Sequence, residues 1–400
     1  MRIAERSKRV EKSETLRVKE KALVLRQQGV DVVDLTAGEP DFPTPPNVCE
    51  AGINAITSGF TRYTANAGIP ELRQAIIDKF EKDNNLTYKT DQVIVSAGAK
   101  QAITNAVLTL LEKGDEAIII APYWVSYIQQ IRLANATPVV IDSSKTNFKL
   151  TPENLEAHIT PRTQMILFNS PSNPCGIVYS PDELAELSEI LRKHDIWVIS
   201  DEIYEKILFD DCVHKSFAEF PDLFEKTIVV NGVSKSYSMT GWRIGYAAGP
   251  TEVIKGMAKI QSHYATPPSI SQKAALEAIS GDQSYIEKMR RTFEERRNKL
   301  VAKLKDFREI KYAYPQGAFY FFLDISPAFG KNWNGKTIET SLDFSEYLIE
   351  SQHLVTVPGT GFGAPDYIRL SFAASERELE DGFNRLLASL KSLEAPGGTN

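Results

Sequence analysis

Short apolar runs alternate with helical patterns through the middle of the chain. The runs are rich in β-branched residues and occur at residues 93–96, 117–120, 138–141, 165–168, 196–200 and 227–230. Runs of this length, separated by helices, are typical of parallel strands that are buried on both faces. The pattern therefore predicts an α/β fold in which a parallel sheet is wrapped by helices.

The two ends of the chain follow other patterns. Residues 13–29 carry apolar positions among charges and stop at Gly29, which predicts an amphipathic helix. Residues 285–304 predict a long charged helix that bridges two lobes, and β structure resumes at 309–324. We therefore expect four parts: an amino-terminal arm (1–30) that packs against the small domain, a large domain (31–290), a small domain (291–393) and a disordered tail (394–400).

Composition limits the class of protein. The chain has 400 residues, 42% hydrophobic and 24% charged, with a net charge of −6, which argues against broad nucleic-acid binding. Cys49, Cys175 and Cys212 are widely spaced and form no CxxC motif, so we expect three reduced thiols. The amino end lacks an apolar signal core and no run reaches eighteen apolar residues, so we expect a cytoplasmic protein.

The most informative stretch is residues 231–243, Asn-Gly-Val-Ser-Lys-Ser-Tyr-Ser-Met-Thr-Gly-Trp-Arg. An amine attacks a carbonyl only when it is unprotonated, and a free lysine has a pKa of about 10.4. Burial or a cationic neighbour such as Arg243 would lower the pKa of Lys235. Ser234 and Arg243 could donate to a phosphate, so the group suits pyridoxal phosphate. A single Ser-Lys pair is more often part of a solvated loop.

Residues suited to binding a ligand follow five of the predicted strands. They are Gly98, Trp124, Asn173, Asp201 and Ser234. Because ligands of such sheets bind beyond the carboxyl ends of the strands, we expect these groups to meet in one crevice. Gly98 precedes a helix start that could hold phosphate. Asp201 could keep a pyridine nitrogen protonated, and Tyr204 and Asn173 could donate to the ring oxygen. Trp124 alone would more often be a core residue.

Arg369 stands in an otherwise apolar strand, where its charge is costly unless it is paired. A substrate carboxylate would pair with it through two hydrogen bonds, and a structural ion pair is the alternative. Gly38 lies in a turn-rich segment where a ligand could approach the backbone. Tyr63 begins a Tyr-x-x-x-x-Gly-x-x-x-Leu-Arg segment, although a lone tyrosine is more often a packing residue.

Three motifs taken together resemble the class I and II aminotransferases of fold-type I, and most closely their bacterial aspartate aminotransferase branch. The motifs are Ser-Lys-x-x-x-x-x-Gly-x-Arg, Ala-Pro-Tyr-Trp-Val-Ser-Tyr and Met-Thr-Gly-Trp-Arg-Ile-Gly-Tyr. The resemblance implies a mostly parallel seven-stranded sheet and a second, smaller α+β domain. It implies that Lys235 forms a Schiff base with pyridoxal 5′-phosphate and moves the proton at the substrate Cα. It further implies ring contacts from Asp201, Asn173, Tyr204 and Trp124, and phosphate contacts from Gly98, Ala99, Lys100, Ser234, Arg243 and Tyr63 of the partner subunit.

The resemblance also bears on the substrate and the assembly. It implies that Arg369, Asn173 and the Gly38 backbone hold the substrate α-carboxylate in a homodimer whose active site is shared. Residues 261–268 lack the arginine that another branch uses for the distal carboxylate, so Lys100 is expected to take that role. Thr15 and Lys12 are expected to close over the ligand.

Three functions remain open at this stage. The sequence favours transamination between aspartate and 2-oxoglutarate. An aromatic or prephenate aminotransferase is the alternative within enzymes. A pyridoxal-binding transcription regulator would need a DNA-binding domain, for which the first thirty residues are too few.

Overall fold

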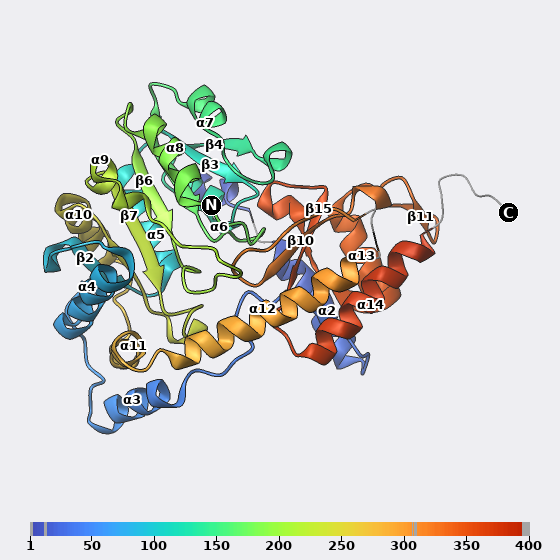
Figure 1. Cartoon of the computed structure of the whole chain (residues 1–400), viewed down its shortest axis with the longest axis horizontal. Helices are drawn as coiled ribbons and strands as arrows, with labels where there is room; N and C mark the ends of the chain where they lie inside the picture. Colours follow the sequence, from blue (N-terminus) through green and yellow to red (C-terminus); the bar gives the residue numbers. More distant parts are fainter. Residues whose placement is uncertain (1–2, 12–13, 306, 308–309, 394–400) are drawn as a thin grey trace.

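The computed structural model describes residues 3–11, 14–305, 307 and 310–393. It contains a large α/β part and a smaller part built on a second sheet, joined along one long helix (Figure 1). The large sheet has seven strands, in the order β2 (Val93–Ser96), β8 (Gly245–Ala248), β7 (Thr227–Gly232), β6 (Trp197–Asp201), β5 (Thr163–Asn169), β3 (Glu116–Ala121) and β4 (Thr137–Asp142).

The α/β fold class expected from the sequence is confirmed, with one strand that departs from the parallel pattern. Five neighbouring strands, β7 to β4, run parallel. β8 is antiparallel to both β7 and β2. The reason is its connection: β8 follows β7 after residues 233–244 without a crossover helix, so it returns in the opposite direction.

Both faces of this sheet are covered, which explains the continuous apolar runs in the strands. Ile118, Ile166 and Val198 face one cluster, whereas their chain neighbours belong to the cluster on the other face. The covering helices are α3 (Pro46–Thr57), α4 (Pro70–Asn84), α5 (Ala99–Leu110), α6 (Ser126–Leu133), α7 (Pro152–His158), α8 (Pro181–Leu191), α9 (Pro221–Phe224), α10 (Thr251–Gln261) and α11 (Ser269–Ser280).

The smaller part is organised around an antiparallel sheet of four strands. Their order is β14 (Val357–Pro358), β15 (Tyr367–Ser371), β10 (Tyr320–Asp324) and β9 (Tyr312–Ala313). A parallel pair, β1 (Val33–Asp34) with β13 (Leu354–Val355), and a hairpin, β11 (Asn332–Trp333) with β12 (Lys336–Thr337), complete its strands. Its helices are α2 (Glu14–Gln27), α13 (Ser341–Gln352) and α14 (Glu376–Ser392).

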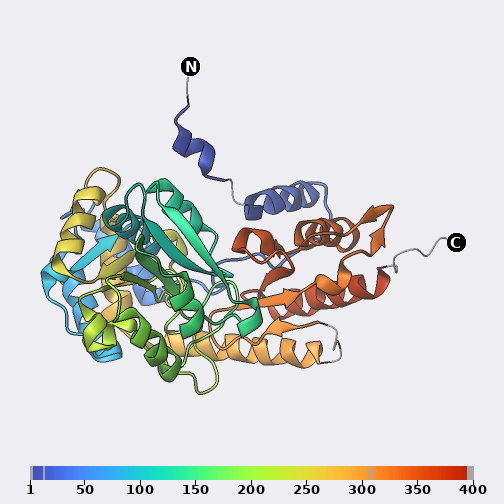
Figure 2. The same ribbon diagram turned by 90° about the horizontal axis from the view of Figure 1, so that it is seen from above.

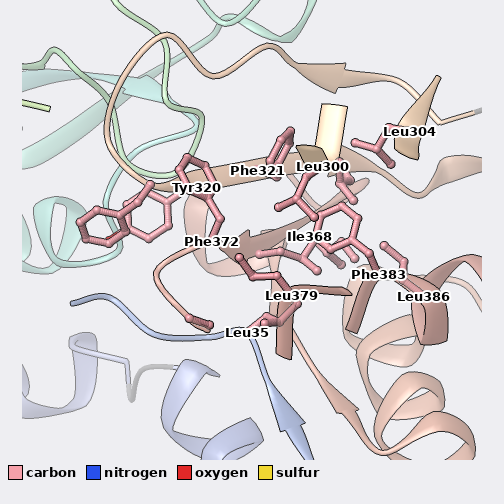
Figure 3. Close-up of a cluster of buried hydrophobic side chains, with 14 of the residues drawn as sticks. Leu35, Leu300, Leu304, Tyr320, Phe321, Ile368, Phe372, Leu379, Phe383 and Leu386 are labelled. Atoms are coloured by element: carbon pink, nitrogen blue, oxygen red, sulfur yellow. The ribbon is translucent and has the colours of Figure 1, made fainter. Parts of the chain in front are cut away.

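The core of the smaller part lies between its sheet and its helices. Figure 3 shows Phe321 and Ile368 from the sheet among leucines of α12 and α14 and Leu35 of the amino-terminal segment. Helix α2 lies beside α13 on the outside of this core, as Figure 2 shows. The short helix α1 (Glu5–Arg9) instead contacts α6 of the large part.

Helix α12 (Ser284–Leu304) runs from the large part into the smaller one (Figure 1). Two buried arginines in its middle fix its position. Arg296 binds both carboxylate oxygens of Asp41, at 2.7 and 2.8 Å, and Arg297 binds those of Asp210 at 2.9 and 2.8 Å. Paired arginines of this geometry are stable in a buried position because both charge and hydrogen-bonding groups are matched.

None of the helices that the structure describes is both long enough and apolar enough to cross a membrane.

Candidate functional site

A cavity of about 530 Å³ opens where the large sheet meets the smaller one. It lies beyond the carboxyl ends of the parallel strands, as expected for a sheet of this type. Eleven residues singled out from the sequence line it: Gly38, Ala99, Lys100, Trp124, Asn173, Asp201, Tyr204, Ser234, Lys235, Arg243 and Arg369.

Lys235 follows β7 and points into this cavity. Its Nζ donates a hydrogen bond of 2.5 Å to the backbone oxygen of Gly38. Burial is the main cause that lowers the pKa of Lys235 to about 8, with smaller contributions from Arg369 and Arg243, while Glu39 opposes the change. With this pKa about a tenth of the amines are unprotonated at pH 7, far more than for a free lysine, and a nucleophilic amine requires this form.

Asp201 is the last residue of β6 and is almost completely buried. Burial raises the pKa of its carboxyl to about 6, although a hydrogen bond from Tyr127 and the charge of Lys235 favour the ionised form. Tyr127 Oη donates to Asp201 Oδ2 at 2.5 Å. The sequence analysis missed Tyr127, although it closes the Ala-Pro-Tyr-Trp-Val-Ser-Tyr motif that was used for the resemblance.

Asn169, the last residue of β5, was also missed. Its Nδ2 donates to the backbone oxygen of Asp201 at 2.9 Å, and its Oδ1 accepts from the backbone N–H of Asn173 at 2.8 Å. One side chain thus connects the backbone segments at the carboxyl ends of two neighbouring strands, β5 and β6. A polar residue at the end of a buried strand was the signal available in the sequence.

Arg369 reaches the cavity from β15 of the smaller sheet. Its Nη1 donates to Asn173 Oδ1 and its Nη2 to the backbone oxygen of Thr36, both at 3.0 Å, and the guanidinium lies 4.4 Å from the centre of the Tyr320 ring. Among the described residues the titratable groups that act on Arg369 are the phenols of Tyr320 and Tyr204 rather than a carboxylate, and the buried Nε has no hydrogen-bond partner. The alternative of a structural ion pair is therefore not what this part of the chain shows.

Tyr204 lies between these two groups of residues. Its hydroxyl is buried and lies 2.9 Å from the hydroxyl of Tyr320. Burial raises the pKa of Tyr204 well above its ordinary value, so the phenol is neutral and available as a hydrogen-bond donor.

The opposite end of the cavity is formed by the start of α5 and by Arg243. Gly98 has φ of +90°, and a Cβ there would lie 2.3 Å from Arg243 Nη2, so only glycine lets the guanidinium lie against this backbone. Lys100 Nζ lies 5.1 Å from the centre of the Trp124 ring. Burial lowers the pKa of Lys100, and the charge of Arg243 adds to this effect.

Four predicted site residues are not among those lining the cavity, and one of them is Gly98, which directly precedes the lining residue Ala99. Tyr63 is 99% exposed on the surface of the single chain. Lys12 lies outside the described residues, and Thr15 lies in α2, but its side chain is outside the described part of the structure. The expected closing role of these last two residues stays a prediction.

The charges in the cavity are strongly unequal. Its lining contains four basic side chains, Lys100, Lys235, Arg243 and Arg369, against the single acid Asp201. Because like charges gathered around one cavity repel one another, the arrangement favours a ligand, or two ligands, carrying more than one anionic group.

Comparisons with known proteins agree with this chemistry. The family model described as "Aminotransferase class I and II" matches residues 30–386. A probable aspartate/prephenate aminotransferase of Rickettsia bellii is 47% identical over 96% of this chain and 98% of its own length. An aspartate aminotransferase of Geobacillus stearothermophilus is 45% identical over 96% and 98%. The crystal structure of the aspartate aminotransferase from Rhizobium meliloti superimposes with a TM-score of 0.95 at 42% identity, covering 98% of this chain and all of that one.

Proposed function

Since this chain belongs to the class I and II aminotransferases, we propose that it transfers the amino group of L-aspartate to 2-oxoglutarate, giving oxaloacetate and L-glutamate, with pyridoxal 5′-phosphate as its cofactor. Relatives of about 45% identity over nearly the whole chain carry the name aspartate aminotransferase. The observation that carries the proposal is the placement of Lys235, as a buried amine of lowered pKa, in one cavity with Asp201 and Arg369.

The residues present fit pyridoxal phosphate. At one end, the start of α5, Ser234 and Arg243 offer backbone and side-chain donors for a phosphate, and the missing Cβ of Gly98 leaves room for the guanidinium. In the middle, Trp124 can cover the face of a ring and Asp201 can accept from a protonated ring nitrogen. These residues would hold the cofactor.

Pyridoxal phosphate, when bound, supplies an electron-withdrawing ring that makes the proton on the substrate Cα acidic. Asp201 keeps the proton on the ring nitrogen, and the Tyr127 hydroxyl holds its carboxylate in place. Lys235 Nζ, which points into the cavity, would take up and give back the proton of the substrate Cα. Tyr204 and Asn173 donate to the ring oxygen, as we infer from their positions in the cavity.

The substrate is held by its carboxylates. Arg369 has a free Nε in addition to its two bonded nitrogens, and Gly38 presents its backbone beside Lys235. We assign the α-carboxylate to Arg369, Asn173 and Gly38. The distal carboxylate of aspartate is assigned to Lys100, whose ammonium group lies beside Trp124.

We further propose that the active protein is a homodimer. Tyr63 is fully exposed in one chain, and Ile53 and Ile56 of α3 are more than half exposed. A second copy would cover these side chains and bring its Tyr63 to the phosphate end of this cavity. We place the cofactor-binding domain at 31–290 and the smaller domain at 291–393. Within the arm at 1–30, α2 packs beside the smaller domain, whereas α1 contacts the larger one.

A dual specificity for aspartate and prephenate is the second candidate. Several relatives carry the name aspartate/prephenate aminotransferase. Because prephenate also carries two carboxylates, the same pair of Arg369 and Lys100 could hold it.

Borohydride reduction followed by peptide mapping tests the role of Lys235. The cofactor should be fixed at Lys235 in the wild-type protein and absent in Lys235→Ala. Fixation at any other lysine would reject the assignment.

A half-reaction screen tests the substrate. The yellow protein is mixed separately with aspartate, glutamate, phenylalanine and the amino product of prephenate, and the loss of visible absorbance is followed. We expect aspartate and glutamate to react fastest. Comparable reaction with aspartate and with the amino product of prephenate would support the second candidate, whereas reaction with the aromatic donors alone would reject the aspartate proposal.

Lys100→Ala separates the two carboxylate sites. The KM for aspartate should rise about 10- to 100-fold, as expected for a lost charged hydrogen bond, whereas the KM for phenylalanine should change little. Lys113→Ala, at an exposed position beyond the same helix, is the control. Equal effects on both substrates would reject this role of Lys100.

A further inference from the structure

A buried network of charged side chains lies behind the segment that carries Asp201 and Tyr204. Glu202 follows Asp201 directly, and its side chain is 1% exposed. Its Oε1 accepts from the hydroxyls of Ser200 and Ser216 at 2.7 and 2.6 Å. Its Oε2 lies 2.9 Å from His214 Nε2. The carboxylate is therefore fully bound, although it does not take part in the cavity.

Glu205 forms the second half of this network. It pairs with Lys79 of α4, which is 4% exposed, and accepts from Asn84 Nδ2 at 3.1 Å. Its Oε2 also lies 4.0 Å from His214 Nε2. On the side that faces away from the cavity, the 201–205 segment is thus held at two points. The 214–216 loop binds Glu202, and α4 binds Glu205.

The charges of the network balance when His214 is protonated. Two carboxylates then face one ammonium group and one imidazolium. Burial alone would lower the pKa of His214, but Glu202 and Glu205 outweigh it and raise the pKa. Burial opposes the ionisation of Glu205, yet Lys79 and His214 lower its pKa to about 2.

A metal ion is the competing use of this cluster. Ligand atoms of Glu202, Glu205 and His214 lie within 4.8 Å of one another. However, Lys79 already neutralises Glu205, and each carboxylate has its hydrogen bonds satisfied by protein groups. A divalent cation would have to displace a buried ammonium group, so the geometry favours the ionic network.

On the basis of the proposed function, we infer that Glu202 and His214 are positioning residues of the enzyme. Their buried pair holds the 201–205 segment so that Asp201 and Tyr204 face the cavity, and its charge balance sets the electric field at the Asp201 carboxylate. Glu202 raises the pKa of Asp201 through its charge, which is the coupling expected between neighbouring buried carboxylates.

Other titratable groups also face the network. Lys206 acts on Glu205 and is paired with Asp83. The phenols of Tyr88 and Tyr246 lie in the field of Glu202, and burial, together with this charge, raises their pKa values. These phenols stay neutral in the pH range of interest, so His214 is the group that changes the charge of the network there.

The test measures the pH at which the absorbance of the bound cofactor changes, in the purified holoenzyme. His214→Gln keeps a hydrogen-bond donor but leaves one carboxylate unbalanced, so this pH should rise by about half to one unit. In Glu202→Gln it should fall or stay unchanged, because His214 can lose its proton. The double variant has a balanced network again and should return to the wild-type value.

The directions in which this pH changes in the three variants distinguish positioning by charge from a merely structural role. Lost packing would make the double variant at least as disturbed as His214→Gln, and that outcome would overturn the inference. No shift in His214→Gln would also overturn it. If His214→Gln does not fold, recovery of folding and of the wild-type pH in the double variant supports the inference, and failure of both overturns it. His158→Gln in α7 is the control.

The cofactor affinity of each cofactor-free protein is measured alongside, by fluorescence titration. If the wild-type protein takes up no pyridoxal phosphate, the proposed function fails and the inference fails with it. If the wild-type protein binds the cofactor and all variants share its pH profile, only the inference fails.

Discussion

Tyr127→Phe is the sharpest test of how this chain controls Asp201. The hydroxyl of Tyr127 is the one side-chain donor to Asp201 among the described residues, at 2.5 Å, and both groups are buried. The Tyr127 ring packs edge-on against Trp124, with centroids 5.3 Å apart, and phenylalanine would keep that contact. The substitution therefore removes a hydrogen bond and little else.

The size of the effect follows from the charge of the acceptor. A hydrogen bond to a charged group contributes about 1.5–3 kcal/mol, which corresponds to a change of about one to two in the pKa of the acceptor. Burial already raises the pKa of Asp201 to about 6, and the phenol of Tyr127 is one of the groups that keeps it from rising further. In Tyr127→Phe we expect the pKa of Asp201 to lie about one to two higher in the cofactor-free protein.

The assay is the affinity of the cofactor-free protein for pyridoxal phosphate between pH 5 and 9. Ionised Asp201 binds the protonated ring, so wild-type affinity should fall as the pH drops below about 6. In Tyr127→Phe the fall should begin about one to two pH units higher. Tyr123→Phe, in the same loop, is the control. Identical pH profiles for Tyr127→Phe and the wild-type protein would refute the reasoning.

Three further changes test other parts of the site. Lys235→Met should stabilise the cofactor-free protein by about 2–3 kcal/mol at pH 7, because burial lowers the pKa of Lys235 from 10.5 to about 8. Between these two pH values the unfolded wild-type chain binds more protons than the folded one, so the wild-type protein gains stability as the pH rises. Denaturant titrations at several pH values should therefore show the stability difference between variant and wild type shrinking from about pH 8 to pH 10.5. A constant advantage would contradict this. Arg369→Lys should lower kcat/KM by about 30- to 1000-fold for aspartate and phenylalanine alike, since about 2–4 kcal/mol of bidentate binding is lost; a loss confined to aspartate would place the distal carboxylate there instead. Gly98→Ala should destabilise the protein by about 1–3 kcal/mol and also weaken cofactor binding. The control Gly114→Ala, at φ of +108° with open space around it, should destabilise the protein without weakening cofactor binding. Thermal unfolding and cofactor titration measure the two effects.

The sequence predicts the architecture well because its signals are local. The apolar runs locate each parallel strand of the large sheet, and the helix start at Thr151 is recognisable from its side chain, which accepts from the backbone of Asn154. The run at 245–248 consists of glycine, tyrosine and alanines, with no β-branched residue, so β8 and its antiparallel direction could not be read from it. Direction there depends on a connection without a helix, which has no sequence pattern of its own.

Site residues are predictable from the sequence where a motif coincides with the end of a strand. The residues that contact these site residues from other elements are less predictable. Lys235, Asp201 and Arg369 could be chosen because a charged residue next to an apolar strand needs an explanation. Tyr127 and His214 act through contacts with residues 74 and 12 positions away, at Asp201 and Glu202. Such partners are set by the packing of separate elements, and a single sequence does not reveal them.

Arg369 belongs to the sheet of the smaller part, whereas Lys100 lies in α5, which covers the sheet of the larger. A dicarboxylate that binds both residues would therefore act as a cross-link between the two parts of the chain. Part of its binding free energy should appear as mechanical coupling, with slower amide hydrogen exchange in β10 and β15, including amides that the ligand never touches.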